Sequence, residues 1–364
     1  MQTDLDRKLM RHALVLARRG LGQVAPNPAV GCVIAAGKRI VGTGWTQPGG
    51  RPHGEAMALV EAGDEATGAT AYVTLEPCSH TGETQPCAEA LIKAGISRVV
   101  YAVSDPDPRV NGSGHAKLAG AGIKVESGVE RAAAERLNAG FILTKTKDRP
   151  LFTLKVAQTL DARTATAAGE SQWITGAEAR RTGHMMRARH DAIMIGITTA
   201  LADNPDLTCR LPGLAGRSPV RIVLDSQLRL PLESKLVQTA GEVPLWLIAG
   251  SDADGQRVGA LEEAGARVIT IPPVRDLTSV ATLLAGKGIT RVLVEGGATL
   301  HASFMAADLV DRLSVFTAPS VMGGDGLTSI AAFGTKKLEQ SVQFRHTHSQ
   351  KCGSDHLDCY ERIM

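Results

Sequence analysis

Two patterns of hydrophobic and polar positions alternate along the chain, and they predict helices and strands in turn. Near the start, apolar residues recur at helical spacing directly after Thr3 and Asp4, which can cap such a helix. Residues 29–34 and 39–43 favour the two strands of a hairpin around residues 36–38. Farther along, the pattern predicts strands at 70–75, 98–103 and 123–125 and helices at 56–62, 88–94, 116–118 and 132–137. This alternation indicates an α/β sheet that helices cover on both faces.

The alternation stops at the polar stretch 144–150, which ends in a proline, and it restarts afterwards. The second part predicts strands at 151–156, 191–196, 220–224, 244–249, 267–271, 291–295 and 313–321, with helices at 177–188 and 298–306. We therefore expect two domains, residues 1–147 and residues 148–364.

Length and composition agree with this division and narrow the class of protein. A chain of 364 residues has room for two domains of roughly 150 residues, each with its own core. A formal net charge of +3 argues against a protein that coats nucleic acid, but it leaves room for a local phosphate site. The charged N-terminus predicts no signal peptide, and no apolar run is long enough for a membrane span, so we expect a cytoplasmic protein. In that compartment, six cysteines favour thiols or metal ligands over disulfides.

The first half contains a set of residues that could hold a catalytic zinc ion. His53, Cys78 and Cys87 supply one imidazole and two thiolates, which leaves a fourth tetrahedral position for water. Zinc lowers the pKa of bound water to about 7, and Glu55, at the start of a predicted helix, could move protons from that water to a leaving amine. The order of these residues matches a zinc deaminase signature, although Cys78 and Cys87 stand farther apart than in the generic pattern. The alternative is a buried thiol pair with an unrelated surface histidine.

Two further residues of this half are candidates for substrate contacts. His80 is a rival metal ligand, but a fourth protein ligand would displace the water, so we expect His80 to contact the substrate. Asn27 lies between two prolines that restrict its backbone, and its carboxamide could pair with an amide-like ring edge. The spacing alone is equally compatible with a plain turn at Asn27.

Three motifs of the first half together resemble the riboflavin-biosynthesis pyrimidine deaminase family. They are Pro-Asn-Pro-x-Val-Gly at 26–31, His-Gly-Glu at 53–55 and Glu-Pro-Cys-Ser-His-x-Gly-x-Thr-x-Pro-Cys at 76–87, and the resemblance covers about the first 145 residues. It implies a cytidine-deaminase-like α/β/α fold and one zinc ion per chain, held by His53, Cys78 and Cys87. It also implies Glu55 as proton donor and acceptor and Asn27 at the pyrimidine. Members of that family often carry a basic residue at the position of Glu83, so the substrate phosphate needs another cation here or Glu83 points away.

The second half has no Gly-x-Gly-x-x-Gly motif after a predicted strand, so nothing supports a Rossmann site. Gly296 and Gly297 instead separate a predicted buried strand from a helix, where backbone N–H groups could bind a phosphate. An ordinary strand-to-helix turn is the alternative. Arg187 and Arg210 could converge on one phosphate through bidentate hydrogen bonds. We expect three neighbouring arginines to lie on a solvated helix face: Arg180, Arg181 and Arg189.

Four motifs of the second half resemble the riboflavin-pathway reductase domain, from about residue 150 to the C-terminus. They are Ser-Gln-Trp-Ile-Thr at 171–175, the segment 201–210, Asp-Ser at 225–226 and Val-Glu-Gly-Gly at 294–297. The resemblance implies a dihydrofolate-reductase-like α/β domain that uses NADPH. At the NADPH it implies Ala157, Trp173, Thr199, Asp203, Ser226, Gly297, Ala298, Thr299, Leu300, His301, Ala302 and Ser303. At the substrate it implies Ser171, Arg187, Leu207, Arg210 and Glu295.

The two resemblances together predict a bifunctional enzyme of riboflavin biosynthesis. Its first half would deaminate 2,5-diamino-6-(5-phosphoribosylamino)pyrimidin-4(3H)-one with zinc. Its second half would reduce the ribosyl chain of 5-amino-6-(5-phosphoribosylamino)uracil to ribityl with NADPH. The only expected partners are this small substrate and further copies of the chain, with a homodimer as the first guess, and neither nucleic acid nor membrane.

Two other functions fit parts of the pattern. One is a tRNA or nucleoside deaminase with an unrelated C-terminal module, although RNA binding favours a basic face with aromatic residues and only 3% of this chain is aromatic. The other is a non-catalytic zinc protein that senses a nucleotide, in which a structural zinc would have four protein ligands.

Overall fold

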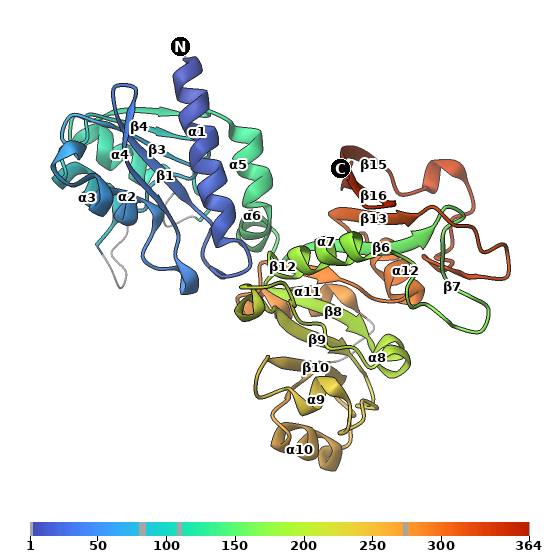
Figure 1. The fold of residues 1–364 in the computed structure, drawn as a ribbon. Coiled ribbons are helices and arrows are strands. Elements are labelled where there is room, and N and C mark those ends of the chain that lie inside the picture. Colours follow the sequence, from blue (N-terminus) through green and yellow to red (C-terminus); the bar gives the residue numbers. More distant parts are fainter. Residues whose placement is uncertain (1–2, 80–84, 108–110, 272–275, 364) are drawn as a thin grey trace. The chain divides into compact units, whose positions relative to one another are not determined.

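The computed structural model describes residues 3–79, 85–107, 111–271 and 276–363 (Figure 1). His80 and Glu83, which the sequence singled out, lie outside these described residues. The chain divides into two compact units, Met1–Arg149 and Pro150–Met364, where the sequence predicted domains 1–147 and 148–364. Within the described ranges, no helix has the length and hydrophobicity that a membrane crossing requires.

The first unit is built on a five-stranded sheet with the order β2-β1-β3-β4-β5. β1 runs antiparallel to both of its neighbours, whereas β3, β4 and β5 are parallel. The strands are β1 (Gly31–Ala36), β2 (Arg39–Trp45), β3 (Thr70–Val73), β4 (Arg98–Tyr101) and β5 (Lys124–Ser127). The α-helices are α1 (Asp4–Ala17), α2 (Gly54–Ala62), α3 (Cys87–Lys93), α4 (Ser113–Gly120), α5 (Arg131–Leu137) and α6 (Ala139–Thr146).

Glycines let two of these helices lie directly on the sheet, on opposite faces. A Cβ atom on Gly31 of β1 would stand 1.9 Å from the carbonyl oxygen of Ala13 in α1. A Cβ atom on Gly44 of β2 would stand 2.1 Å from the carbonyl oxygen of Gly54 in α2. Gly44 pairs with the residue that follows Gly31, and neighbouring residues of a strand point to opposite faces. The sheet is therefore covered on both faces, as the sequence pattern predicted.

Two sequence predictions for this unit can be compared in detail with the structure. The helix predicted after Thr3 is confirmed, since Thr3 and Asp6 form a reciprocal capping box at the start of α1. The polar stretch predicted as a linker from residue 144 is partly wrong, because α6 continues to Thr146. Its threonines are accommodated in the helix: the hydroxyls of Thr144 and Thr146 donate to the carbonyls of Phe141 and Ile142 at 2.7 and 2.8 Å.

The second unit is built on a nine-stranded sheet with the order β11-β10-β9-β8-β12-β6-β13-β16-β15, in which only the pairs β13–β16 and β16–β15 are antiparallel. Its strands are β6 (Leu151–Thr159), β8 (Ala192–Gly196), β9 (Val220–Leu224), β10 (Leu245–Gly250), β11 (Arg267–Ile271), β12 (Arg291–Val294), β13 (Arg312–Ala318), β15 (Phe344–Cys352) and β16 (Asp355–Arg362). β7 (Arg163–Ala165) and β14 (Leu327–Thr328) form a separate pair. The α-helices are α7 (Ala177–Arg187), α8 (Ile197–Asp203), α9 (Lys235–Gln238), α10 (Gly255–Glu263), α11 (Leu277–Gly286) and α12 (Ala298–Ala306).

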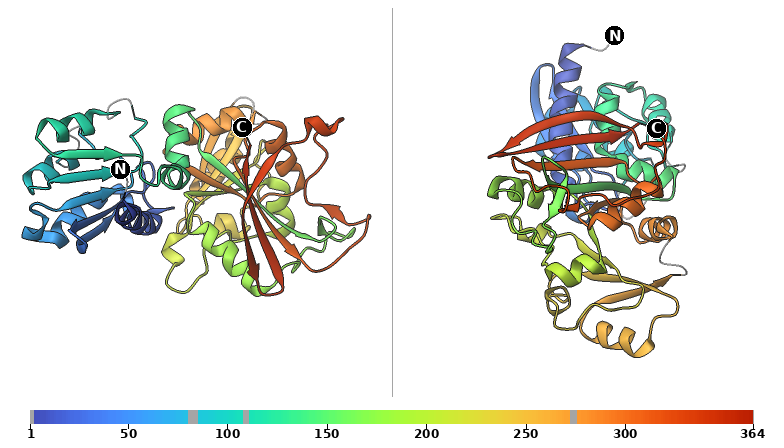
Figure 2. Two further views of the ribbon diagram at one scale, coloured as in Figure 1. Left: turned by 90° about the horizontal axis from the view of Figure 1, so that it is seen from above. Right: turned by 90° about the vertical axis from the view of Figure 1, so that its right-hand side faces the viewer.

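Helices pack on both faces of this larger sheet, and the side chains of one strand alternate between the two cores. Met194 of β8 belongs to a core that includes residues of α11 and α12. Ile193 and Ile195 belong to a second core that includes residues of α9 and α10. The two views of Figure 2 show the β13, β15 and β16 part of the sheet in red and orange. The strand predicted at 313–321 ends earlier, at Ala318, because Pro319 follows and has no N–H for the ladder.

Candidate active sites

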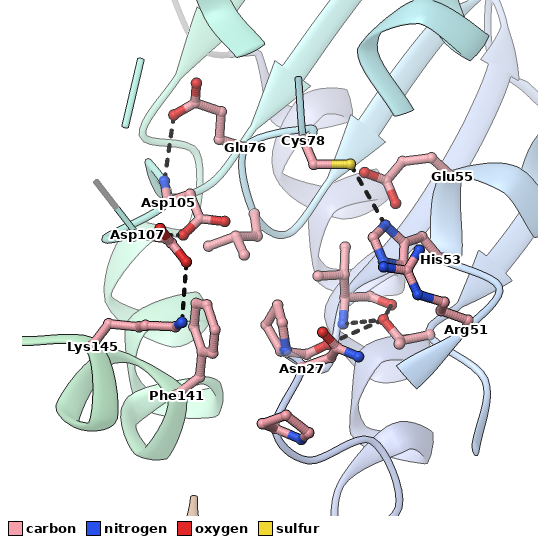
Figure 3. A pocket seen from close by; sticks show the side chains of 15 residues that line it. Asn27, Arg51, His53, Glu55, Glu76, Cys78, Asp105, Asp107, Phe141 and Lys145 are labelled. Carbon is pink, nitrogen blue, oxygen red and sulfur yellow. Dashed lines mark hydrogen bonds and ion pairs between the residues drawn. The ribbon is translucent and has the colours of Figure 1, made fainter. Parts of the chain in front are cut away.

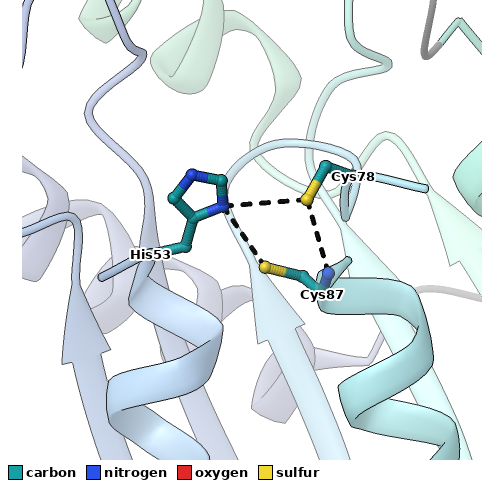
Figure 4. Close-up of side chains that lie close together, drawn as sticks. All are labelled: His53, Cys78 and Cys87. Atoms are coloured by element: carbon teal, nitrogen blue, oxygen red, sulfur yellow. Dashed lines mark hydrogen bonds between the residues drawn. The ribbon is translucent and has the colours of Figure 1, made fainter. Parts of the chain in front are cut away.

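Three side chains of the first unit converge on one point that could hold a metal ion (Figure 4). His53 is the N-cap of α2, Cys78 follows β3, and Cys87 is the first residue of α3. The Nδ1 atom of His53 lies 3.3 Å from the Sγ of Cys87 and 3.7 Å from the Sγ of Cys78. A tetrahedral zinc ion with bonds of about 2.0 Å to nitrogen and 2.3 Å to sulfur would place its ligand atoms roughly 3.5–3.8 Å apart. The three side chains therefore fit zinc, with His53 ligating through Nδ1.

The two thiols of this cluster differ in their electrostatic environment. A hydrogen bond with Cys87 and another with His53 outweigh burial and lower the pKa of Cys78 to about 4. The hydrogen bond with Cys78, together with burial, raises the pKa of Cys87 well above its ordinary value. The backbone N–H of Cys87 also donates to the Sγ of Cys78 at 3.3 Å. The lowered pKa favours the thiolate form of Cys78, which is the form that binds a metal, and coordination would deprotonate Cys87.

Glu55 lies beside this cluster in the first turn of α2, as Figure 3 shows. Its side chain is buried, and its Oε2 atom has no hydrogen-bond partner among the described residues. Burial raises the pKa of this carboxyl to about 7. A group with such a pKa can accept and donate a proton near neutral pH, which is the property that the sequence analysis required of Glu55.

A cavity of about 190 Å³ opens in front of the cluster (Figure 3). Asn27 lines it, and a Cβ atom on Gly50 would stand 1.9 Å from the Nδ2 of Asn27. Gly50 has a positive φ of 88°, so the backbone turn at this glycine packs closely against the carboxamide. Asn27 therefore lies where a substrate could reach it, and its contact with a pyrimidine stays a prediction.

The cavity wall also contains charged residues to which the sequence analysis assigned no role: Arg51, Glu76, Asp105, Asp107 and Lys145. Asp105 and Asp107 lie a few residues after β4, within an Asp-Pro-Asp-Pro run that was visible in the sequence. Glu76 has a structural task, since its carboxylate accepts from the backbone N–H groups of Asp105, Gly112 and His115 at 3.0–3.3 Å. Lys145 belongs to α6, the helix that the polar pattern concealed.

In the second unit, Arg187 and Glu295 form a bidentate ion pair at the ends of α7 and β12. The Nε and Nη2 atoms of Arg187 lie 2.8 and 3.0 Å from the two carboxylate oxygens. Burial alone would raise the pKa of Glu295, but Arg187 and Lys155 lower it to about 2. The Nη1 atom of Arg187 donates to the carbonyl of Thr208 at 3.0 Å. Arg187 thus has a buried carboxylate as its partner, where the sequence led us to expect a phosphate.

The remaining residues predicted at the substrate lie in separate segments. Arg210 is half-exposed and pairs with Asp206 at 3.3 Å, and Leu207 is buried in the same loop. Ser171 precedes α7, in the segment that also carries Trp173. The Nζ atom of Lys155 on β6, a residue that the sequence analysis did not single out, lies 3.8 Å from the Oε2 of Glu295.

The residues predicted at NADPH follow the carboxyl ends of parallel strands, where α/β sheets bind ligands. Ala157 is near the end of β6, Thr199 and Asp203 belong to α8 after β8, and Ser226 follows β9. The turn after β12 begins α12 with the last group of predicted residues: Gly297, Ala298, Thr299, Leu300, His301, Ala302 and Ser303. The N–H of Gly297 donates to the hydroxyl of Thr199 at 3.1 Å, which joins two of these segments.

Two observations fit a phosphate-bearing cofactor at this edge. The N-cap of α12 is Gly297, which has no side chain to cap the first N–H groups of the helix. Trp173 is 66% exposed, with the guanidinium of Arg180 at 4.5 Å from its ring centroid, and so presents a flat apolar surface. The roles of these residues toward NADPH stay predictions.

Comparison with known proteins places both units in one family. The model of the cytidine and deoxycytidylate deaminase zinc-binding region matches residues 3–103, and that of the RibD C-terminal domain matches residues 150–357. The second match contradicts the alternative of an unrelated C-terminal module. The chain is 40% identical to the riboflavin biosynthesis protein RibD of Aquifex aeolicus over 100% of both chains. It is 41% identical to that of Escherichia coli strain K12 over 96% of this chain and 97% of the relative.

Solved structures agree with the sequence comparison and confirm the predicted α/β fold class. Acinetobacter baumannii RibD matches with a TM-score of 0.89 and 37% identity over 99% of both chains. The diaminohydroxyphosphoribosylaminopyrimidine deaminase/5-amino-6-(5-phosphoribosylamino)uracil reductase of Thermotoga maritima matches with a TM-score of 0.88 and 32% identity over 99% of both chains. The chain therefore belongs to the RibD family, the bifunctional deaminases and reductases of riboflavin biosynthesis.

Proposed function

We propose that this chain catalyses two consecutive steps of riboflavin biosynthesis. The first is the hydrolytic deamination of 2,5-diamino-6-(5-phosphoribosylamino)pyrimidin-4(3H)-one. The second is the NADPH-dependent reduction of the ribosyl chain of 5-amino-6-(5-phosphoribosylamino)uracil to ribityl. The observation that carries the proposal is the cluster of His53, Cys78 and Cys87 beside the buried carboxylate of Glu55, on a chain that continues into a RibD C-terminal domain.

In the deamination, we assign His53, Cys78 and Cys87 as the ligands of one zinc ion. When bound, zinc makes hydroxide available at neutral pH. Glu55 accepts the proton that the attacking water loses and returns it to the amine, which leaves as ammonia. Asn27, on the cavity wall, pairs through its carboxamide with the amide-like edge of the ring and so orients the carbon that is attacked.

In the reduction, NADPH supplies the hydride, and the protein orients the sugar and supplies a proton. The cofactor binds along the carboxyl edge of the sheet, at Trp173, Thr199 and the start of α12. Lys155 is the proton donor to the sugar oxygen that opens, because its ammonium lies in the same cluster as Glu295 and only 22% of its side chain is exposed. Glu295 remains charged beside it, and Arg187 holds that carboxylate in place.

We also propose that the enzyme works in the cytoplasm as a homo-oligomer, with a homodimer as the first guess. All six cysteines are free thiols, which agrees with a reducing compartment. The small phosphorylated pyrimidine is its substrate, and no nucleic acid is required.

The decisive experiment incubates the purified protein with the diaminopyrimidine substrate, with and without NADPH, and identifies the products by mass. We expect the deaminated product in both cases and the reduced product only with NADPH. Glu55→Ala abolishes ammonia release but leaves NADPH oxidation on the pre-deaminated substrate unchanged. Glu61→Ala, on the same helix, is the matched control and retains both activities. Ammonia release by Glu55→Ala at the wild-type rate would refute the role of Glu55.

A further inference from the structure

Two basic side chains, Arg51 and Lys145, are among the described residues that line the deaminase cavity. Figure 3 shows them on different sides of the cavity: Arg51 lies next to His53, and Lys145 lies across the cavity with Phe141 and Asp107. Arg51 is close enough to His53 to act electrostatically on its imidazole. The cavity thus has one cation beside the metal ligands and one at the opposite side.

The shape of the proposed substrate separates the roles of these two cations; this step rests on the proposed function. The carbon that loses its amine must lie at the metal ligands. The 5-phosphate is at the other end of the molecule, beyond the ribose, so it points away from His53. Of the two cations, Lys145 is the one on that side of the cavity.

Lys145 is held in place at the cavity wall. Its Nζ atom lies 3.0 Å from the Oδ2 of Asp107, which is 7% exposed, and 5.8 Å from the ring centroid of Phe141 one helical turn earlier. The backbone N–H of Asp107 in turn donates to Asp105 at 2.9 Å. An ammonium group has three N–H donors, and one bond to Asp107 leaves others for a ligand. About a third of the Lys145 side chain is exposed, which leaves the group accessible.

The other described charges on this side of the cavity are acidic, so a phosphate placed here needs a cation beside it. Asp105 and Asp107 both line the cavity, and burial raises the pKa of Asp105 to about 6. The carboxylate of Glu76 already accepts from three backbone N–H groups. In the sequence, Glu83 occupies a position where a basic residue was expected, so that position supplies no cation.

We propose that Lys145, held by Asp107, binds the 5-phosphate of the deaminase substrate and thereby makes this half select phosphorylated over unphosphorylated pyrimidine ribosides. The contact is a charge-assisted hydrogen bond between the ammonium and a phosphate oxygen. It contributes to substrate binding and leaves the chemistry at the metal ligands unchanged.

The test compares Lys145→Met with the wild type on two substrates, the 5-phosphorylated diaminopyrimidine riboside and its enzymatically dephosphorylated form. We expect KM for deamination of the phosphorylated substrate to rise about 10- to 100-fold, because a hydrogen bond to a charged group is lost. We expect kcat/KM for the dephosphorylated substrate to stay the same. Lys145→Arg retains the charge and most of the preference. Lys93→Met, an exposed lysine at the end of α3, is the matched control and changes neither value.

The alternative outcomes are distinct. Equal losses on both substrates, or no loss on either, overturn the proposal, because Lys145 would then serve only the position of Asp107 or nothing. A phosphate-selective rise in KM for Arg51→Met but not for Lys145→Met also overturns it. Bound zinc per chain, measured by elemental analysis, reports whether the first unit of each variant is folded. If the wild type releases no ammonia from the phosphorylated substrate, the proposed function itself fails.

Discussion

The two units place their functional groups in opposite ways. In the first unit, three candidate metal ligands lie within 4.8 Å of one another, with Glu55 buried beside them. In the second unit, the candidate cofactor residues are spread over segments that follow β6, β8, β9 and β12. Arg187, Glu295 and Lys155 form a tight group there. The difference teaches that a metal site needs side chains from several elements to converge on one point. A site for a large cofactor instead needs residues spread along an edge of the sheet, against which the cofactor lies.

The largest effect is expected from the loss of one ligand of the metal cluster. Cys87→Ser removes a thiolate, so we expect bound zinc, measured by elemental analysis, to fall from about one ion per chain to near zero. Ammonia release falls below detection, while NADPH oxidation on the uracil substrate continues. Cys359→Ser, which changes a thiol of the second unit, is the control. Full zinc content and activity in Cys87→Ser would contradict the ligand assignment.

A second, smaller effect is expected from breaking the ion pair of the second unit. Arg187→Met leaves Glu295 buried without its main partner, which costs about 3–5 kcal/mol of unfolding free energy. We expect urea to unfold the second unit at a lower concentration and NADPH oxidation to fall, while ammonia release is retained. Arg181→Met, an exposed residue on the same helix, is the control. If both variants have the same urea midpoint, the pair is not a stabilising element.

Acid should affect the second unit through the same pair. The pKa of Glu295 is lowered to about 2 in the folded state, so its stabilising charge is fully present above its unfolded pKa and is lost as the pH falls. Between about pH 4.5 and pH 2, the unit should lose about 3 kcal/mol of stability from this group. Urea unfolding of the wild type and of Glu295→Gln at several pH values measures this loss. The variant should lack this part of the pH dependence; parallel curves would exclude Glu295 as its source.

The first unit has its own acid-sensitive pair, so acid unfolding alone does not distinguish the two units. Arg98 lowers the pKa of Asp6, which Arg98 and Tyr72 contact at 2.8 and 2.9 Å. The comparison therefore needs a signal specific to each unit, such as ammonia release for the first and NADPH oxidation for the second.

The smallest effect is expected at the contact between α8 and α12. Thr199→Val removes the hydroxyl that accepts from the N–H of Gly297, at a cost of about 1 kcal/mol. We expect KM for NADPH to rise about fivefold with ammonia release unchanged. Thr198→Val, one residue earlier and exposed, is the control. An unchanged KM for NADPH in Thr199→Val would show that this contact does not contribute to cofactor binding.

Much of the fold was predictable from local pattern. The strand β11 and the helix α12 begin and end where the sequence predicts, because apolar runs and strong boundaries define them. The hairpin of β15 and β16 was missed, because β15 is rich in polar residues and lies at the sheet edge, where burial imposes no alternation.

The candidate site residues likewise divide into those that the sequence singled out and those that it did not. Motif order singled out His53, Cys78 and Cys87, and the structure brings these three together. Lys155 and Lys145 were not singled out, since each matters through a partner far away in the sequence, Glu295 and Asp107. Local spacing carries no information about such pairs.

The close approach of α2 to the sheet has a consequence for the way this enzyme can evolve. Gly44 carries no functional group, yet any side chain there would meet the backbone of Gly54 and Ala58. Even alanine would push α2 outward and carry His53 and Glu55 away from Cys78 and Cys87. In a library of all single substitutions selected for growth without riboflavin, we expect Gly44 to tolerate as few replacements as a metal ligand. A position with no chemistry of its own would thus appear, by mutational tolerance, as part of the active site.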